Sequence, residues 1–153
     1  LKDGSRKKYK LLFLGAGWMR AEVEEKVKQH GLGDSVLFVG EVSNPQDYYH
    51  MMDIFVMPSL FDGYGIALEE AEVNGLPCFA SDKVPQEVDV LGHIRYLPLD
   101  LKVWQKGIEA QALGRRKDLG RELKQRGYDI ADAARNLQEA YIRLYKEAVG
   151  RNG

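Results

Sequence analysis

The sequence lacks most features of exported and membrane-embedded proteins. Its 153 residues include one cysteine, Cys78, so no disulfide can form within the chain, and we expect this thiol to be buried and reduced. No apolar run approaches the length of a membrane-spanning helix, and no signal-peptide pattern opens the sequence. We therefore predict a cytoplasmic protein, and any membrane contact would have to be peripheral, at the inner face.

The chain also has little net charge, because 22 basic and 23 acidic residues give a formal charge of -1. The distribution is uneven: between Glu41 and Asp100 eleven acidic residues accompany only Lys83 and Arg95, whereas residues 2–10 and 115–126 are rich in bases. No recognition motif with interleaved aromatic residues accompanies these basic segments. We interpret them as solvated surface and expect no nucleic-acid partner.

Short apolar runs alternate with helical patterns over the first hundred residues. Continuous apolarity indicates strands buried on both faces, and the alternation predicts an open α/β fold, a Rossmann-like parallel sheet with helices on both faces. Pro45 is expected at the first position of its helix, after Asn44 as N-cap, and Gly75 is expected to close the following one. The predicted strands are 10–15, 36–40, 54–58, 77–81 and 94–99, and the predicted helices are 18–30, 44–52 and 65–74.

Only helices are predicted after Asp100. The segments 101–113, 117–127 and 129–149 have helical patterns, and the last carries an apolar stripe that includes Leu137, Tyr141 and Leu144. We expect these helices to pack on the sheet. The prediction is a single domain over 1–153, with an α/β core at about 1–100 and C-terminal helices at 101–153.

Two glycine-containing loops follow predicted strands, where parallel sheets bind ligands. Gly15 and Gly17 permit close approach of a ligand, but Arg20 stands where the dinucleotide fingerprint has its third glycine. A tight strand-to-helix turn explains the pair equally well. Their residues alone leave both interpretations open.

The loop from Pro58 to Gly65 leads into a helix whose N-terminus is suited to bind phosphate. Asp62 precedes this helix and Glu70 lies inside it, so both carboxylates could contact one ligand. Pattern alone favours a different interpretation, in which Asp62 is a helix cap and Glu70 belongs to a solvated face with Glu69 and Glu72. His50 and His93 are interpreted as surface or structural residues.

The stretch "FVMPSLFDGYGIALEEAEVNGLPCFAS" closely resembles the signature of the retaining, nucleotide-sugar-dependent family four glycosyltransferases of the GT-B fold. The shared positions run from Pro58 to Ser81, and the resemblance covers most of 11–99. "IRYLPLD" with Trp104 is similar to the bacterial exopolysaccharide and capsule branch. The resemblance implies the C-terminal, donor-binding half of such an enzyme.

Residue roles follow from this resemblance position by position. Glu70 matches the glutamate that binds the ribose hydroxyls, and Asp62 stands where a longer glutamate usually contacts the donor sugar, so this contact is atypical. Glu69 and Glu72 match no family function and are left as solvated or structural. The remaining implied contacts are the base at Val42, the sugar at Gly63, Tyr64 and Gly65, and the diphosphate at Ile66 and Ala67.

The implied reaction is retaining hexosyl transfer from a nucleoside-diphosphate sugar, with a UDP-sugar favoured, in polysaccharide or glycoconjugate biosynthesis. The acceptor would be a glycan or lipid-linked sugar bound through an N-terminal domain, and neither a tightly bound cofactor nor a metal is implied. A noncatalytic nucleotide-binding α/β module and a sugar-nucleotide epimerase of GT-B architecture are the alternatives.

The family's donor domain opens with a strand and a helix that supply an arginine and a lysine to the diphosphate, and neither is found in 1–153. Together with the absence of an initial methionine, this predicts a fragment that is inactive alone. The absent strand is central in the usual order, so we expect a gap in the sheet, which a strand-sharing oligomer could fill.

Overall fold

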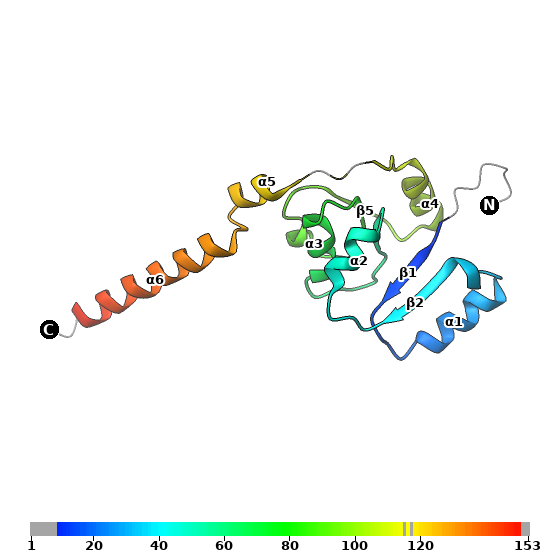
Figure 1. The fold of residues 1–153 in the computed structure, drawn as a ribbon, viewed down its shortest axis with the longest axis horizontal. Coiled ribbons are helices and arrows are strands. Elements are labelled where there is room, and N and C mark those ends of the chain that lie inside the picture. Colours follow the sequence, from blue (N-terminus) through cyan, green and yellow to red (C-terminus); the bar gives the residue numbers. More distant parts are fainter. Residues whose placement is uncertain (1–8, 115, 117, 151–153) are drawn as a thin grey trace. The chain divides into compact units, whose positions relative to one another are not determined.

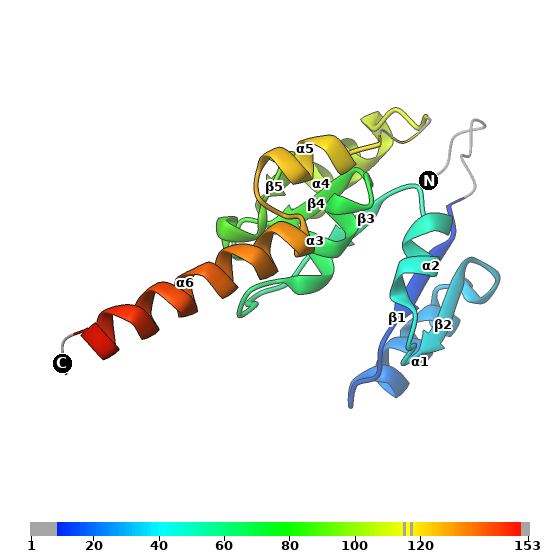
Figure 2. The ribbon, with the colours of Figure 1, turned by 60° about the vertical axis from the view of Figure 1, so that its left-hand side comes forward.

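The computed structural model describes residues 9–114, 116 and 118–150. The chain divides into two compact units, with the boundary between Tyr48 and Tyr49. Each unit contains a parallel sheet of its own, two strands in the first and three in the second, as labelled in Figures 1 and 2. The predicted basic segment at the start of the chain lies outside the described residues, apart from Lys10.

The first unit pairs β1 (Leu11–Leu14) with β2 (Val36–Gly40), and α1 (Arg20–Gln29) and the 3-10 helix η1 (Gly33–Ser35) connect them. The rings of Phe13 and Phe38 stack at a centroid distance of 5.1 Å. The prediction of strands buried on both faces is wrong here, since each face keeps large exposed side chains. Two strands give each side chain a strand neighbour on one side only. The exposed set comprises Leu11, Phe13, Leu37 and Val39.

The second unit has the strand order β3 (Phe55–Met57), β4 (Cys78–Ser81), β5 (Ile94–Leu97). Every residue of β4 is buried, as predicted, because this strand has a neighbour at each edge. Cys78 is a buried free thiol, and burial raises the pKa of this thiol to about 12.

Helices cover both faces of the β3–β5 sheet. On one face, α3 (Ile66–Val73) places Leu68 and Ala71 in a buried cluster with Cys78 and Ala80. Since side chains alternate along a strand, Phe79 points to the other face, where α4 (Leu101–Ala110) packs Gly107 against its ring. Figure 2 shows this layering, and it confirms the predicted α/β class. The helix α2 (Pro45–Met51) precedes β3 and begins at the predicted proline.

The C-terminal helices differ in their packing. Leu119 and Leu123, at α5 (Gly120–Gln125), join a buried cluster with Val90 and Leu91. The stripe of α6 (Ile130–Gly150) stays exposed, with Tyr141 at 68%. The expectation that the last helix packs on the sheet is therefore wrong, since α3 and α4 already cover that sheet. No helix in the described part of the chain is long and apolar enough to span a bilayer.

Candidate functional site

The loop that follows β3 is built around Gly65, the N-cap residue of α3. Gly65 has a φ of 90°, and a Cβ atom there would lie 3.4 Å from Cγ1 of Val84. Both the left-handed backbone and this neighbour favour glycine at 65. Gly63 shows neither a positive φ nor a neighbour within 4 Å of such a Cβ, so the local backbone favours glycine at Gly65 and not at Gly63.

Asp62 shapes this loop but does not cap the helix. Its Oδ1 accepts a hydrogen bond of 3.1 Å from the backbone N–H of Tyr64, the geometry of an Asx turn. No side chain caps α3 at its N-terminus. The interpretation of Asp62 as a helix cap is therefore wrong, because its carboxylate binds the N–H of Tyr64, which precedes the helix.

The N-terminus of α3 has the features expected of an anion site. Among the described residues, the backbone N–H groups of Ile66 and Ala67 donate no hydrogen bond, and the Ile66 side chain is 64% exposed. Unpaired N–H groups at a helix N-terminus carry partial positive charge. Beside them, a hydrogen bond with Glu69 raises the pKa of the exposed Tyr64 phenol.

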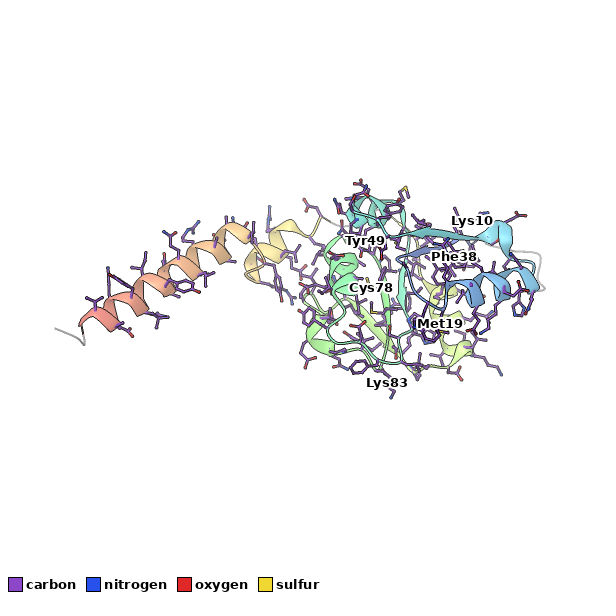
Figure 3. All side chains as sticks on the ribbon, turned by 90° about the horizontal axis from the view of Figure 1, so that it is seen from below. Lys10, Met19, Phe38, Tyr49, Cys78 and Lys83 are labelled. Atoms are coloured by element: carbon purple, nitrogen blue, oxygen red, sulfur yellow. The ribbon has the colours of Figure 1, made fainter. Side chains whose placement is uncertain are left out.

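Glu70 lies on α3 with its side chain half-buried. Its Oε2 accepts a hydrogen bond of 2.9 Å from the hydroxyl of Tyr49, and Asn74 donates to its backbone carbonyl. Tyr49 is 4% exposed and belongs to the same buried cluster as Cys78, and Figure 3 labels both residues. Burial, followed by the bond to Glu70, raises the pKa of Tyr49 well above its ordinary value.

Glu72, two residues further along, is 1% exposed and is not part of a solvated face. Its carboxylate accepts hydrogen bonds from the backbone N–H groups of Val90, Leu91 and His93, the shortest at 3.0 Å. The solvated interpretation of Glu72 is wrong, and the structural one holds. Burial, followed by the hydrogen bond with Asp89, raises the pKa of Glu72 to about 7.

The candidate residues of the first unit gather where β1 and β2 end. The N–H of Gly15, whose φ is 106°, donates to the Gly40 carbonyl at 2.7 Å, whereas Gly17 has neither a positive φ nor a close neighbour. A cavity of about 180 Å³ here is lined by Gly15, Gly17 and Arg20. Val42 follows β2 with a half-buried side chain. Arg20, placed over the Phe38 ring at 5.6 Å, brings a cation to these strand ends.

A larger cavity of about 440 Å³ lies elsewhere in the second unit. It is lined by Asp53, Pro77 and His93, which precede β3, β4 and β5. These are the amino ends of the parallel strands, whereas the Pro58–Gly65 loop follows a carboxyl end. The cavity therefore does not coincide with the predicted site. The His50 and His93 side chains are both exposed, as expected of surface residues.

Sequence reasoning missed two members of these sites. In the sequence Arg20 stands out only because it takes the place of a glycine, whereas in the structure its charge lies at the ends of β1 and β2. Tyr49 carries no motif signal, because one tyrosine on the buried side of a short helix is a common core residue. Tyr49 and Glu70 are 21 positions apart in the sequence, so their hydrogen bond can be identified only in the folded structure.

A family model described as glycosyl transferases group 1 matches residues 1–95. The chain belongs to this glycosyltransferase family. EpsF of Bacillus subtilis, a protein named as a glycosyltransferase, is 36% identical to this chain over 140 residues. The aligned region covers 88% of this chain and 36% of EpsF. The chain thus spans about a third of this curated relative.

Two further comparisons extend the family match. The lipopolysaccharide core biosynthesis mannosyltransferase LpsB of Rhizobium meliloti is 42% identical over 62 residues, which is 40% of this chain and 18% of that one. The structure of Anabaena HepE in complex with UDP superposes with a TM-score of 0.59 at 17% identity, over 68% of this chain and 31% of that one. The latter likeness supports the fold, which is that of the family.

Proposed function

We propose that this chain is the nucleotide-sugar-binding part of a glycosyltransferase that acts in polysaccharide or glycoconjugate biosynthesis. The observation that carries the proposal is the pairing, on α3, of unpaired N–H groups at the N-terminus with a half-exposed Glu70 one turn further. Family membership supports it, and so does the name of the LpsB relative.

In the proposed complex, the donor's diphosphate lies at the N–H groups of Ile66 and Ala67. Helical side chains tilt toward the N-terminus, so the Glu70 carboxylate extends back toward that end and accepts hydrogen bonds from the ribose hydroxyls. Gly63, Tyr64 and Gly65 offer backbone to the sugar, with Asp62 beside them. For the first unit, taken by itself, we propose that Gly15 and Gly17 let a ligand approach the backbone closely and that the backbone at Val42 recognises the base.

The reaction proposed is retaining hexosyl transfer. The bond between the anomeric carbon and the diphosphate breaks, a bond to the acceptor's hydroxyl oxygen forms, and the proton of that hydroxyl passes to the departing diphosphate. The contribution of this chain is to position the donor and to stabilise the negative charge that develops on the departing diphosphate, with the α3 N-terminus as its source of positive potential. A UDP-sugar is the favoured donor, and the fold's likeness to a UDP complex is in keeping with it.

Residues outside 1–153 complete the proposed enzyme. They would supply the acceptor site, for a glycan or lipid-linked sugar, and the basic groups that the diphosphate also needs. We place the enzyme in the cytoplasm, peripherally at the inner face of the membrane. Residues 1–153 alone would be inactive, and a strand shared between copies could pair with the free edges of their sheets.

The test is calorimetric titration of UDP, GDP and ADP into the full-length protein. We expect one nucleotide to bind and Glu70→Ala to weaken it at least tenfold, a loss of about 1.4 kcal/mol. Glu139→Ala is the matched control, because it removes an exposed helical glutamate from α6 and should leave affinity unchanged. Binding that is absent, or indifferent to Glu70, would contradict the proposal.

A further inference from the structure

We infer that Tyr49 is a positioning residue of the donor site, whose hydroxyl holds one oxygen of Glu70 so that the other faces the ribose. The inference rests on the proposed function, because it gives Glu70 the role of ribose ligand. Tyr49 itself would touch neither the nucleotide nor the reacting atoms.

The Tyr49 ring is held rigidly. It is 4% exposed, and it meets the ring of Phe55 edge to face at a centroid distance of 5.9 Å. Phe55 begins β3, and Leu68 of α3 belongs to the same buried cluster. A close-packed aromatic ring has little freedom, so the position of its hydroxyl is fixed by the core.

The Glu70 carboxylate, in contrast, depends on one hydrogen bond. Its Oε2 accepts from the Tyr49 hydroxyl at 2.9 Å, and within the described residues its Oε1 accepts from no other group. An ionised carboxylate can accept several hydrogen bonds, so Oε1 stays available for two vicinal hydroxyls. Without Tyr49 the glutamate side chain would occupy several rotamers, and binding would have to order it.

The chemistry of the pair suits this role. Burial and the bond to Glu70 raise the pKa of Tyr49, so its hydroxyl keeps its proton throughout the neutral range and always donates. A hydroxyl that donates to a carboxylate forms a charge-assisted bond, which is stronger than a neutral one. The contact would therefore persist over the pH range in which the enzyme is assayed.

A purely structural Tyr49 would fill the core and no more, and Tyr49→Phe separates the two roles because it keeps the ring and removes the hydroxyl. The nucleotide that binds full-length protein best among UDP, GDP and ADP is compared with its 2′,3′-dideoxy analogue, which lacks the hydroxyls that Glu70 would bind. We expect Tyr49→Phe to weaken the ribonucleotide about five- to tenfold, the size of one ordinary hydrogen bond. Tyr49→Phe should bind the dideoxy analogue as tightly as the wild-type protein does. In a protein that already carries Glu70→Ala, adding Tyr49→Phe should not weaken ribonucleotide binding further.

The outcomes distinguish the two proposals. If no nucleotide binds the wild-type protein, or Glu70→Ala has no effect, the proposed function fails and the inference fails with it. If Glu70→Ala weakens binding while Tyr49→Phe does not, only the positioning role is overturned. An equal loss for the ribonucleotide and its dideoxy analogue in Tyr49→Phe would also overturn it, since the hydroxyl would then act through the fold as a whole.

Discussion

Two glutamates of α3, one on its more exposed face and one on its buried face, have different hydrogen-bond partners. Glu70 is half-buried and accepts one side-chain hydrogen bond, from Tyr49, whereas Glu72 is 1% exposed and accepts bonds from three backbone N–H groups. A carboxylate whose acceptor positions are filled by its own chain has no capacity for a ligand. A partly filled carboxylate at the surface retains that capacity.

Glu72 and Arg126 bind the backbone of the segment that leads into β5 from two sides, and we call this pair of residues the clamp. Glu72 accepts the N–H groups of Val90 and Leu91, while the Arg126 guanidinium donates to their carbonyls at 2.8 and 3.2 Å. The backbone of this segment is thereby satisfied from both sides. The comparison of the two faces predicts that changes at Glu72 affect stability and that changes at Glu70 affect binding.

The largest expected effect is that of Glu72→Ala. It leaves the buried Leu91 N–H without an acceptor and empties the space of a buried side chain. The N–H groups of Val90 and His93 lose one of two acceptors, since they also donate to the Val88 carbonyl and to Asp89. The cost should be about 3 kcal/mol of unfolding free energy. Urea denaturation followed by circular dichroism measures it. Glu72→Gln is the control, because its amide keeps an acceptor oxygen and should lose less than half as much. Equal stability of Glu72→Ala and wild type would contradict the clamp.

The pH dependence of stability should come next in size. The pKa of Glu72 is raised from 4.5 to about 7 by burial first and Asp89 second, against the N–H groups of His93 and Leu91, which lower it. Because the folded state holds this proton more tightly, its contribution is complete below about pH 4.5 and is lost as pH rises through 7. We expect a loss of about 2 kcal/mol from this group between pH 5 and 8.

Urea denaturation at pH 5, 6, 7 and 8 checks this prediction. Glu72→Gln, which mimics the protonated acid, removes the titrating group, and its stability should decline less steeply over the same range. Parallel profiles for the two proteins would show that Glu72 does not titrate in this interval.

A smaller effect is expected on the other side of the clamp. Arg126→Met keeps the aliphatic stem and removes the two donors to the Val90 and Leu91 carbonyls, and the expected cost is about 1 kcal/mol. Arg126→Lys keeps the charge but not the forked geometry, so it should recover only part of the loss. Complete recovery by lysine would assign the effect to charge alone.

The smallest expected effect on stability belongs to Glu70→Gln. The glutamine can still accept from the Tyr49 hydroxyl, so the free energy of unfolding should change by less than about 0.5 kcal/mol. Thermal unfolding monitored by calorimetry measures the change. A loss as large as that of Glu72→Ala would mean that the two faces of α3 do not differ as described.

Much of this contrast could not be predicted from sequence. The strand and helix order followed from apolar runs, from Pro45 and from Gly75, because these signals are local. Glu69, Glu70 and Glu72 look alike in one dimension, and their separation depends on which helix face meets Val90 and Leu91 across eighteen or more positions. The family resemblance singled out Glu70, but neither pattern nor resemblance predicted the burial of Glu72.

The stripe of α6 shows the opposite error. Its spacing correctly predicted an amphipathic helix, and the expectation that such a face must pack on the sheet was wrong. Periodicity reports that one face is apolar and does not specify what covers it. The same limit applies to β1 and β2, whose apolar runs resemble that of the fully buried β4.

The most direct test of the central claim is a crystal structure of the full-length protein with UDP bound. We predict that the ribose hydroxyls lie within hydrogen-bond distance of Glu70 Oε1 while Tyr49 still holds Oε2. The diphosphate should lie at the N–H groups of Ile66 and Ala67. UDP bound at the amino ends of β3, β4 and β5, or at α3 with its ribose away from Glu70, would contradict the account.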